Sequence, residues 1–295
     1  MRIVFAGGVI FSAELLAHLV NSRIELVGVI APNLAMNADY ADLSSVATKY
    51  DIPFIATNDI NALDTQCWLS LMNCDLLICV GWSRLLSKPT LGIPRLGVIG
   101  YHPTLLPMHR GRHPIIWPIA LGLTETGSTF FKMDEGIDTG EILSQRRVPI
   151  SIDDNAQTMY QKLLNVAKKQ IIEILNKVVA TGQIKGVVQD VKVGSSWRKR
   201  SFSDGVIDWR MAAVDIHNLV RALHPPYPCG SFMYSGKEIK VIKTQVLSQD
   251  KLEKVEPGKV LHRQTNSVIT IQTGNGLISL LDYHPKLRIE IGEYL

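Results

Sequence analysis

The 295-residue sequence lacks the features that mark exported, membrane-spanning or disulfide-stapled proteins. None of its four cysteines (Cys67, Cys74, Cys79 and Cys229) belongs to a C-x-x-C pair, so we expect buried, reduced thiols rather than disulfides or a zinc site. No apolar run approaches the roughly 18 residues that span a bilayer, and the opening MRIVFAGG shows no signal-peptide pattern. We therefore expect a soluble protein of the cytoplasm.

The sequence also lacks a large excess of charge of either sign, because its 31 Lys and Arg residues and 27 Asp and Glu residues leave a net charge of +4. That excess is too weak to indicate a nucleic-acid binder. The pair Gly7-Gly8 lacks the G-x-G-x-x-G spacing of dinucleotide sites, since Val9 and Ser12 occupy the other glycine positions. His109 and His113 lie in a proline-bracketed loop without a nearby carboxylate, so no metal site is expected.

Short apolar runs alternate with helical patterns over the first hundred residues. The runs show no polar alternation, which is typical of strands in a parallel sheet covered on both faces. They are Ile3–Ala6, Glu25–Ala31, Phe54–Ala56, Leu76–Val80 and Val98–Gly100. The pattern predicts a doubly wound, mostly parallel α/β fold, whose ligands bind beyond the carboxyl ends of the strands.

The pattern changes after Ile150. A long helix is predicted over Ala156–Ala180, followed by an exposed linker that carries Arg198-Lys199-Arg200. A short helix and five short strands in about sixty residues then predict a small β-barrel of the oligonucleotide-binding type. We assign residues 1–190 to the α/β domain, 191–206 to the linker and 207–295 to the barrel.

A histidine and an aspartate stand at the predicted ligand edge of the sheet. His102 directly follows the strand Val98–Gly100, and Asp138 lies in a glycine-flanked loop after the predicted strand Ser128–Met133. A carboxylate can orient an imidazole so that it works as an acid or a base near neutral pH. A hydrogen-bonded loop histidine and a capping aspartate fit the same spacing, and spacing alone leaves both interpretations open.

A longer set of blocks surrounds these two residues. The blocks are His102 with Leu105-Leu106-Pro107 and Arg110-Gly111, then Glu125-Thr126-Gly127, then Met133 to Gly140. With them the sequence resembles the folate-dependent formyltransferase family, which includes methionyl-tRNA formyltransferases and the N-formyltransferases of nucleotide-linked amino sugars. Ile207-Asp208-Trp209 and Val220-Arg221-Ala222 resemble the C-terminal domain of the transfer-RNA enzymes and of the aminoarabinose formyltransferase. The resemblance covers nearly the whole chain.

The resemblance implies an N-formyltransferase that moves a formyl group from N10-formyltetrahydrofolate to a primary amine. His102 would donate to the oxyanion of the tetrahedral intermediate, and Asp138 would hold and charge the imidazole. The family has an Asn where this chain has Gly100, and loss of one such donor costs on the order of a hundredfold in rate. We favour a replacement by Arg112, His113 or water, with a slow enzyme or a pseudo-enzyme as alternatives.

The resemblance also implies binding residues. Folate is expected at Gly81, Trp82, Leu85 and Leu86, and at the loop of Asp134, Glu135, Gly136 and Ile137. The substrate is expected at Gly7, Gly8, Thr104, Leu106, Pro107, Arg110 and Arg112.

Two amines compete as substrate. The transfer-RNA branch of the family carries a basic loop after the second strand, whereas Asn33–Ser45 here contains no Lys or Arg. The segment Ile24–Ser83 has Lys49 as its one basic residue. Its seven acidic residues are Glu25, Asp39, Asp42, Asp51, Asp59, Asp64 and Asp75. An acidic face disfavours a long polyanion.

We therefore expect the substrate to be an amino sugar, nucleotide-linked, used in lipopolysaccharide or O-antigen synthesis. Nucleic-acid and membrane partners are not expected, and a homodimer is compatible with the interpretation. The alternatives are a methionyl-tRNA formyltransferase and a catalytically impaired homologue that binds folate or a nucleotide.

Overall fold

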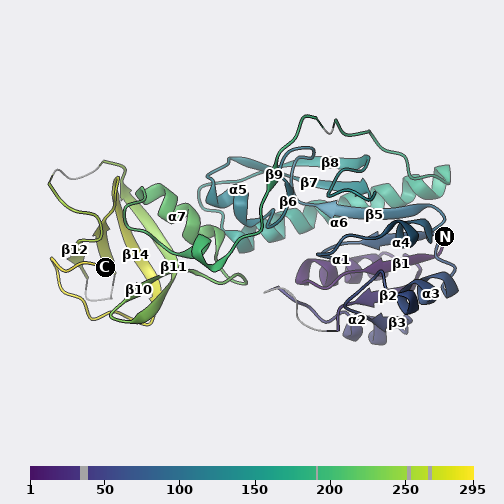
Figure 1. Cartoon of the computed structure of the whole chain (residues 1–295), viewed down its shortest axis with the longest axis horizontal. Coiled ribbons are helices and arrows are strands. Elements are labelled where there is room, and N and C mark those ends of the chain that lie inside the picture. Colours follow the sequence, from purple (N-terminus) through teal and green to yellow (C-terminus); the bar gives the residue numbers. More distant parts are fainter. Residues whose placement is uncertain (34–38, 191, 251–253, 265–267) are drawn as a thin grey trace. The chain divides into compact units, whose positions relative to one another are not determined.

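The computed structural model of the chain describes residues 1–33, 39–190, 192–250, 254–264 and 268–295 (Figure 1). These residues form two compact units. The first consists of Met1–Pro114, Thr126–Val148 and Tyr160–Arg198, and the second of Ile115–Glu125, Pro149–Met159 and Lys199–Leu295. The domain bounds given by the sequence stay predictions. Residue 191 of the expected linker and residues 34–38 of the segment Asn33–Ser45 lie outside the described residues.

The first unit is built on a seven-stranded sheet of order β3-β2-β1-β4-β5-β7-β8. Its strands are β1 (Ile3–Ala6), β2 (Leu26–Ala31), β3 (Phe54–Ala56), β4 (Leu76–Cys79), β5 (Gly97–His102), β7 (Glu125–Lys132) and β8 (Ile142–Pro149). The first five run parallel, and β7 pairs antiparallel with β5. The predicted doubly wound α/β fold is confirmed.

Helices bury the apolar strands. α3 (Leu63–Leu71) and α4 (Lys88–Gly92) pack on the sheet face that carries Val4 and Ala6 of β1. Ile3 and Phe5 point to the opposite face and are also buried, as the unbroken apolar pattern of β1 predicts.

Two further helices pack against each other in this unit. α1 (Ile10–Asn21) and α6 (Ala156–Thr181) meet through the rings of Phe11 and Tyr160 and through an ion pair of Glu14 with Lys168. A short helix, α2 (Ser44–Lys49), follows β2. No helix among the described residues combines the length and the apolar character needed to cross a bilayer.

The second unit contains a five-stranded antiparallel sheet of order β10-β11-β14-β13-β12. Its elements are α5 (Ile116–Ala120), a 3-10 turn η1 (Phe202–Gly205), α7 (Ala213–Ala222), β10 (Gly230–Tyr234), β11 (Lys237–Ser248), β12 (Val260–Arg263), β13 (Ile269–Gln272) and β14 (Leu277–His284). The five predicted strands are present. Among the residues that the structure describes, no ladder joins β10 to β12, so the sheet has two edges.

The four cysteines are free thiols. Cys74 and Cys79 are buried as predicted, and burial raises the pKa of Cys74 to about 11 and that of Cys79 to about 12. The prediction of burial is wrong for Cys67, because it lies on the outer face of α3 between the buried Thr65 and Leu69.

The strand order places a topological switch point between β1 and β4. From β1 the chain proceeds to β2 and β3 on one side, and it then returns to form β4 and β5 on the other. Ligands of such sheets bind outside the carboxyl ends of the strands at this point.

Candidate active site

His102 is the last residue of β5 and is almost completely buried, with 4% of its surface exposed. Side chains alternate along a strand, so His102 and Gly100 face one side of the sheet while Tyr101 faces the other. The Tyr101 ring stacks on Phe11 of α1, with 4.8 Å between the ring centroids. β5 therefore fixes the imidazole at the carboxyl edge of the sheet.

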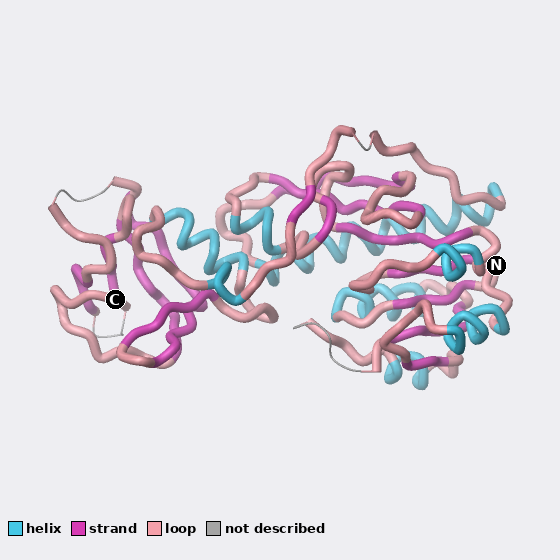
Figure 2. The backbone as a smooth tube through the Cα atoms, viewed as in Figure 1, coloured by secondary structure: helices cyan, strands magenta, loops and turns pink. Residues whose placement is uncertain are grey.

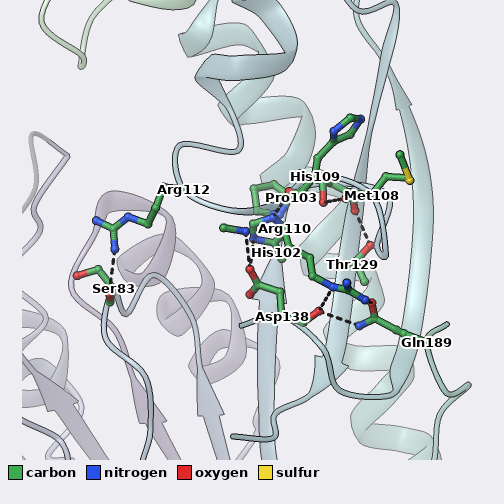
Figure 3. Close-up of polar contacts among 12 residues, drawn as sticks. Ser83, His102, Pro103, Met108, His109, Arg110, Arg112, Thr129, Asp138 and Gln189 are labelled. Atoms are coloured by element: carbon green, nitrogen blue, oxygen red, sulfur yellow. Dashed lines mark hydrogen bonds and ion pairs between the residues drawn. The ribbon is translucent and has the colours of Figure 1, made fainter. Parts of the chain in front are cut away.

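His102 and Asp138 meet at this edge. The His102 Nδ1 atom lies 3.5 Å from Asp138 Oδ2 (Figure 3). The same carboxylate oxygen accepts a hydrogen bond of 2.9 Å from the backbone N–H of Gly111. Asp138 has a φ of 54°, which turns the loop between β7 and β8 so that its side chain reaches the histidine.

The second ring nitrogen fixes the tautomer of His102. Its Nε2 atom lies 2.8 Å from the backbone carbonyl oxygen of His109, and a carbonyl oxygen only accepts. Nε2 therefore carries a hydrogen, and Nδ1 is the ring nitrogen that faces Asp138. The Nε2–H is thus donated to His109, and the role of His102 as a donor to the oxyanion stays a prediction.

Arg110 and Gln189 support the loop that carries Asp138. The Arg110 Nε–H donates to the backbone oxygen of Asp138 at 3.1 Å, and its Nη2 donates to Gln189 Oε1 at 2.7 Å. Gln189 in turn donates through Nε2 to the backbone oxygens of Asp138 and Gly140, at 2.9 Å and 2.7 Å. Arg110, expected at the substrate, thus has its guanidinium bonded within the protein.

A short strand borders the loop that follows β5. β6 (Arg110–Gly111) pairs in parallel with β9 (Ser196–Trp197) (Figure 2). β9 lies in the segment that the sequence interpretation assigned to an exposed linker. The backbone N–H groups of Arg110 and Arg112 donate to the backbone oxygens of Ser195 and Trp197, at 2.9 Å and 3.1 Å. Two-residue strands have no hydrophobic period, so the pattern of the sequence could not reveal this pairing.

His109 makes the side-chain contacts to this strand. Its backbone N–H donates to Ser195 Oγ at 3.0 Å, and its Nδ1 lies 3.1 Å from the same oxygen. Its ring stacks on Trp197, with 4.2 Å between centroids and 9° between the planes. Burial, and then the charge of His102, lower the pKa of His109.

The space beside Gly100, where the resemblance implies an Asn in the family, is filled. A Cβ atom at Gly100 would lie 2.7 Å from Met133 Cγ and 2.9 Å from Phe131 Cζ. Both side chains come from β7 and the residue after it, and Phe131 pairs directly across from Gly100. An asparagine side chain therefore has no room there unless these two neighbours move.

A pocket lies at the switch point of the sheet. Gly8 lines it after β1, and Gly81 and Trp82 line it after β4; their roles in binding substrate and folate stay predictions. Ser83 and Arg84, from the same segment after β4, also line it. The sequence interpretation missed Pro32 and Asn58, which follow β2 and β3 without forming a motif. Gly7 does not line this pocket.

Gly7 instead lets the start of α1 lie close to the ends of β1 and β4. A Cβ atom at Gly7 would lie 2.5 Å from Ser12 Cβ, and the Ser12 hydroxyl donates to the backbone oxygen of Val80 at 2.6 Å. The glycine therefore permits α1 to attach to the end of β4.

The two segments expected at folate contain both exposed and buried apolar side chains. Leu85 and Ile137 leave 51% and 55% of their surface exposed and thus offer apolar surface to a ligand. Lys88 and Glu135 join the two segments through an exposed ion pair of 3.6 Å. Leu86, by contrast, is buried in the core cluster.

Asp134 and Gly136 build the second of these segments. Asp134 Oδ1 accepts hydrogen bonds from the Gly136 N–H at 3.0 Å and from the Thr139 hydroxyl at 2.7 Å. The carboxylate thus fixes the turn that presents Ile137.

The remaining residues expected at the substrate divide into buried and reachable ones. Thr104 is fully buried and donates its hydroxyl to the backbone oxygen of Met108, and Leu106 is buried beside Pro107. Arg112 reaches across to the loop after β4, where its Nη1 donates to the backbone oxygen of Ser83 at 2.9 Å (Figure 3). Gly8 and Arg112 are thus the expected substrate residues that border the pocket or its loop.

Comparison with known families matches both parts of the chain. Residues 34–175 match the family described as formyl transferase, and residues 200–294 match the formyl transferase C-terminal domain. The methionyl-tRNA formyltransferase of Wigglesworthia glossinidia brevipalpis is 32% identical over 286 residues, which cover 95% of this chain and 88% of that protein.

Solved structures share the fold. WlaRD, a sugar 3N-formyl transferase crystallised with dTDP and 5-N-formyl-THF, superposes with a TM-score of 0.67 at 20% identity, covering 97% of this chain and 99% of its own. An N-formyltransferase from Helicobacter canadensis, in complex with folinic acid and dTDP-3-aminofucose, gives a TM-score of 0.67 at 20% identity and covers 95% and 98%.

Proposed function

The chain belongs to the formyltransferase family, and on that premise we propose that it transfers a formyl group from N10-formyltetrahydrofolate to the amine of a nucleotide-linked amino sugar. One observation carries the proposal: Nδ1 of His102 faces the Asp138 carboxylate at the ligand edge of the sheet, 3.5 Å away. Formyl transfer to an amine needs a group that takes up the proton which the amine loses.

The residues around the pocket fit a folate with an apolar ring system and a polar edge. Leu85 and Ile137 are exposed apolar side chains on two segments that Lys88 and Glu135 join. The Trp82 indole N–H is buried and has no hydrogen-bond partner among the described residues, so a bound molecule can supply one. When bound, N10-formyltetrahydrofolate would supply the activated formyl carbon.

His102 and Asp138 would transfer the proton of the attacking amine to the departing nitrogen of the donor. As the amine nitrogen bonds to the formyl carbon, Nδ1 takes up the amine proton, directly or through a water. The carboxylate stabilises the resulting imidazolium, because opposite charges lie side by side in a buried site. Nδ1–H can then return the proton to the departing nitrogen of the donor, which balances the transfer.

The electrostatics of the pocket edge support a small substrate. Arg84 lines the pocket and Arg112 reaches the neighbouring loop, which is enough for a short phosphate group. The acidic segment Ile24–Ser83 would repel a long polyanion. The structural neighbours that hold dTDP or a dTDP-linked sugar agree with this choice. A formylated sugar would enter lipopolysaccharide or O-antigen synthesis in the cytoplasm.

A second candidate is initiator methionyl-tRNA. The observation that favours it is the 32% identity to a methionyl-tRNA formyltransferase over 95% of this chain.

A direct competition between the two amines tests the proposal. The purified protein is supplied with N10-formyltetrahydrofolate and with either a dTDP- or UDP-linked amino sugar or methionyl-tRNA, and the formylated product is identified by mass spectrometry. We expect formylated sugar nucleotide, and no product from an Asp138→Asn variant. Formyl-methionyl-tRNA as the sole product would instead establish the second candidate. The absence of a formylated product from either amine would overturn the proposal that the protein catalyses formyl transfer.

A further inference from the structure

We propose that Ser195 and Trp197 are positioning residues for His102, acting through the backbone carbonyl of His109. The inference rests on the proposed function, in which Nδ1 of His102 takes up the amine proton. It assigns a role in the reaction to a segment 57 residues beyond Asp138 in the chain.

The His109 carbonyl decides which nitrogen of His102 carries the hydrogen. It accepts the Nε2–H at 2.8 Å, and this bond turns Nδ1 towards the Asp138 carboxylate, 3.5 Å away. The position of this carbonyl depends on a backbone conformation that is rare for a residue with a side chain, since His109 has a φ of 63°. A conformation of this kind is unfavourable and persists only where surrounding contacts hold it.

Ser195 supplies two of these contacts with one oxygen. Its Oγ accepts the His109 backbone N–H at 3.0 Å, and its own hydrogen is then available for His109 Nδ1 at 3.1 Å. That second bond requires an unprotonated Nδ1. The lowered pKa of His109, which burial causes, keeps the ring in this state at neutral pH.

Trp197 holds the other side of the same residue. Its indole stacks on the His109 ring at 4.2 Å, and its backbone oxygen accepts the Arg112 N–H at 3.1 Å. Gly111 precedes Arg112 and pairs with Trp197. Its φ of 98° and its close approach to the Trp197 backbone oxygen leave no room for a Cβ. The N–H of Gly111 donates to Asp138, so β9 supports both members of the catalytic pair.

The test compares Ser195→Ala, Ser195→Thr and Trp197→Ala with Ser196→Ala, a matched control because Ser196 is the exposed residue of the same strand. In the full-length protein, kcat and the KM for each substrate are measured from pH 5.5 to 9. We expect Ser195→Ala and Trp197→Ala to lower kcat about tenfold or more, since small displacements of reacting groups carry losses of this size. KM should change by less than about threefold, Ser195→Thr should retain most of the activity, and Ser196→Ala should match the wild type.

A second readout does not depend on activity. The ¹⁵N NMR signals of the His102 ring, assigned with a His102→Gln variant, report which nitrogen carries the hydrogen. We expect the Nε2–H form in the wild type and in Ser196→Ala, and a mixture of both tautomers in Ser195→Ala.

The outcomes separate the two proposals. If no amine is formylated but the tautomer shifts in Ser195→Ala, the proposed function fails and the positioning role stands. The positioning role is overturned if Ser195→Ala leaves kcat and the tautomer unchanged, or if it lowers kcat further in a His102→Gln background, where no imidazole remains to be positioned.

Discussion

Gly100 shows at the scale of one residue how the family pattern has been altered. The side of β5 on which an asparagine would project is occupied by Met133 and Phe131. These side chains are buried or nearly so, and a further side chain in a filled space forces its neighbours to shift. The missing amide is therefore part of a rebuilt packing arrangement, and reintroducing it alone should not restore a family-type site.

We expect Gly100→Asn to lower both the melting temperature and kcat, because the new side chain collides with Met133. The double variant Gly100→Asn, Met133→Ala should recover the melting temperature in part, since the truncated side chain makes room. Thermal unfolding and turnover measured on the wild type, both single variants and the double variant give the coupling directly. A gain in turnover from Gly100→Asn alone would mean that the site still accepts the family's donor.

His109 predicts a specific dependence of stability on pH. Its folded-state pKa lies below the ordinary value of 6.5, so the unfolded chain binds this proton more readily. The stability that depends on the neutral ring is complete above about pH 6.5 and is lost as the pH falls from there towards the folded-state pKa. His109→Phe keeps an aromatic ring against Trp197 but cannot be protonated.

The fall in melting temperature between pH 7.5 and 5.5 should thus be smaller for His109→Phe than for the wild type. Ser195→Ala serves as the control, because it removes the hydrogen bonds while the imidazole still titrates. Equal losses in the wild type and in His109→Phe would show that this ring contributes nothing to the acid sensitivity.

At the scale of elements, the two segments that we expect to bind folate each present an exposed apolar side chain. Leu85 and Ile137 lie on separate loops. Lys88, three residues after Leu85, forms an exposed ion pair with Glu135, two residues before Ile137. Burial of one such side chain against a ligand contributes about 1.5–3 kcal/mol. The exposed ion pair contributes little by itself.

Leu85→Asn and Ile137→Asn should each raise the KM for N10-formyltetrahydrofolate about tenfold or more, with the melting temperature unchanged. Leu121→Asn is the control, since Leu121 is equally exposed but belongs to the second unit. Steady-state kinetics at saturating amine measure the effect. A KM for the amine that rises instead would assign these loops to the other substrate.

The elements also show what the sequence can predict. The strands β1, β2, β3 and β4 are unbroken apolar runs, and their predicted bounds agree with the structure to within a residue. β5 is longer than predicted at both ends and includes His102, because Tyr101 and His102 continue the pairing with β7. β6 and β9 escaped prediction, since pairing over two residues leaves no periodic signal.

The site was predictable only where a residue and its partner both lie in matched blocks. His102 and Asp138 do, and they meet. Gln189, Ser195 and Trp197 lie in a segment whose composition resembles a linker, and their contacts depend on tertiary structure that no local pattern encodes. The same limit explains why Arg110 was expected at the substrate, although its guanidinium supports the Asp138 loop.

At the scale of the whole molecule, the distribution of charge separates the two candidate substrates. The whole chain has a net charge of +4, but the segment Ile24–Ser83 is acidic, because it contains seven Asp and Glu residues and one basic residue, Lys49. A protein that makes many phosphate contacts loses affinity steeply as salt displaces it from the polyanion.

We expect kcat/KM for the amino-sugar substrate to fall by less than about tenfold between 50 and 200 mM salt. A transfer-RNA enzyme with six to ten phosphate contacts would lose roughly 10³–10⁵ in affinity over the same range. Initial rates at subsaturating substrate across a salt series measure the slope. A slope as steep as that of a polyanion binder would favour methionyl-tRNA as the substrate.

The bond between His109 and Ser195 joins residues that are 86 positions apart, and this separation affects how the protein is made. A ribosome that adds roughly 5–20 residues per second needs about 4–17 s to extend the chain from one to the other. During that interval β5 can already pair with its neighbours, while the loop after it still lacks the strand that holds the His109 carbonyl. The nascent chain therefore passes through a period in which its sheet can form but its imidazole is not yet oriented. Pulse-labelling hydrogen exchange on stalled nascent chains should show β1 and β4 protected before the N–H of His109.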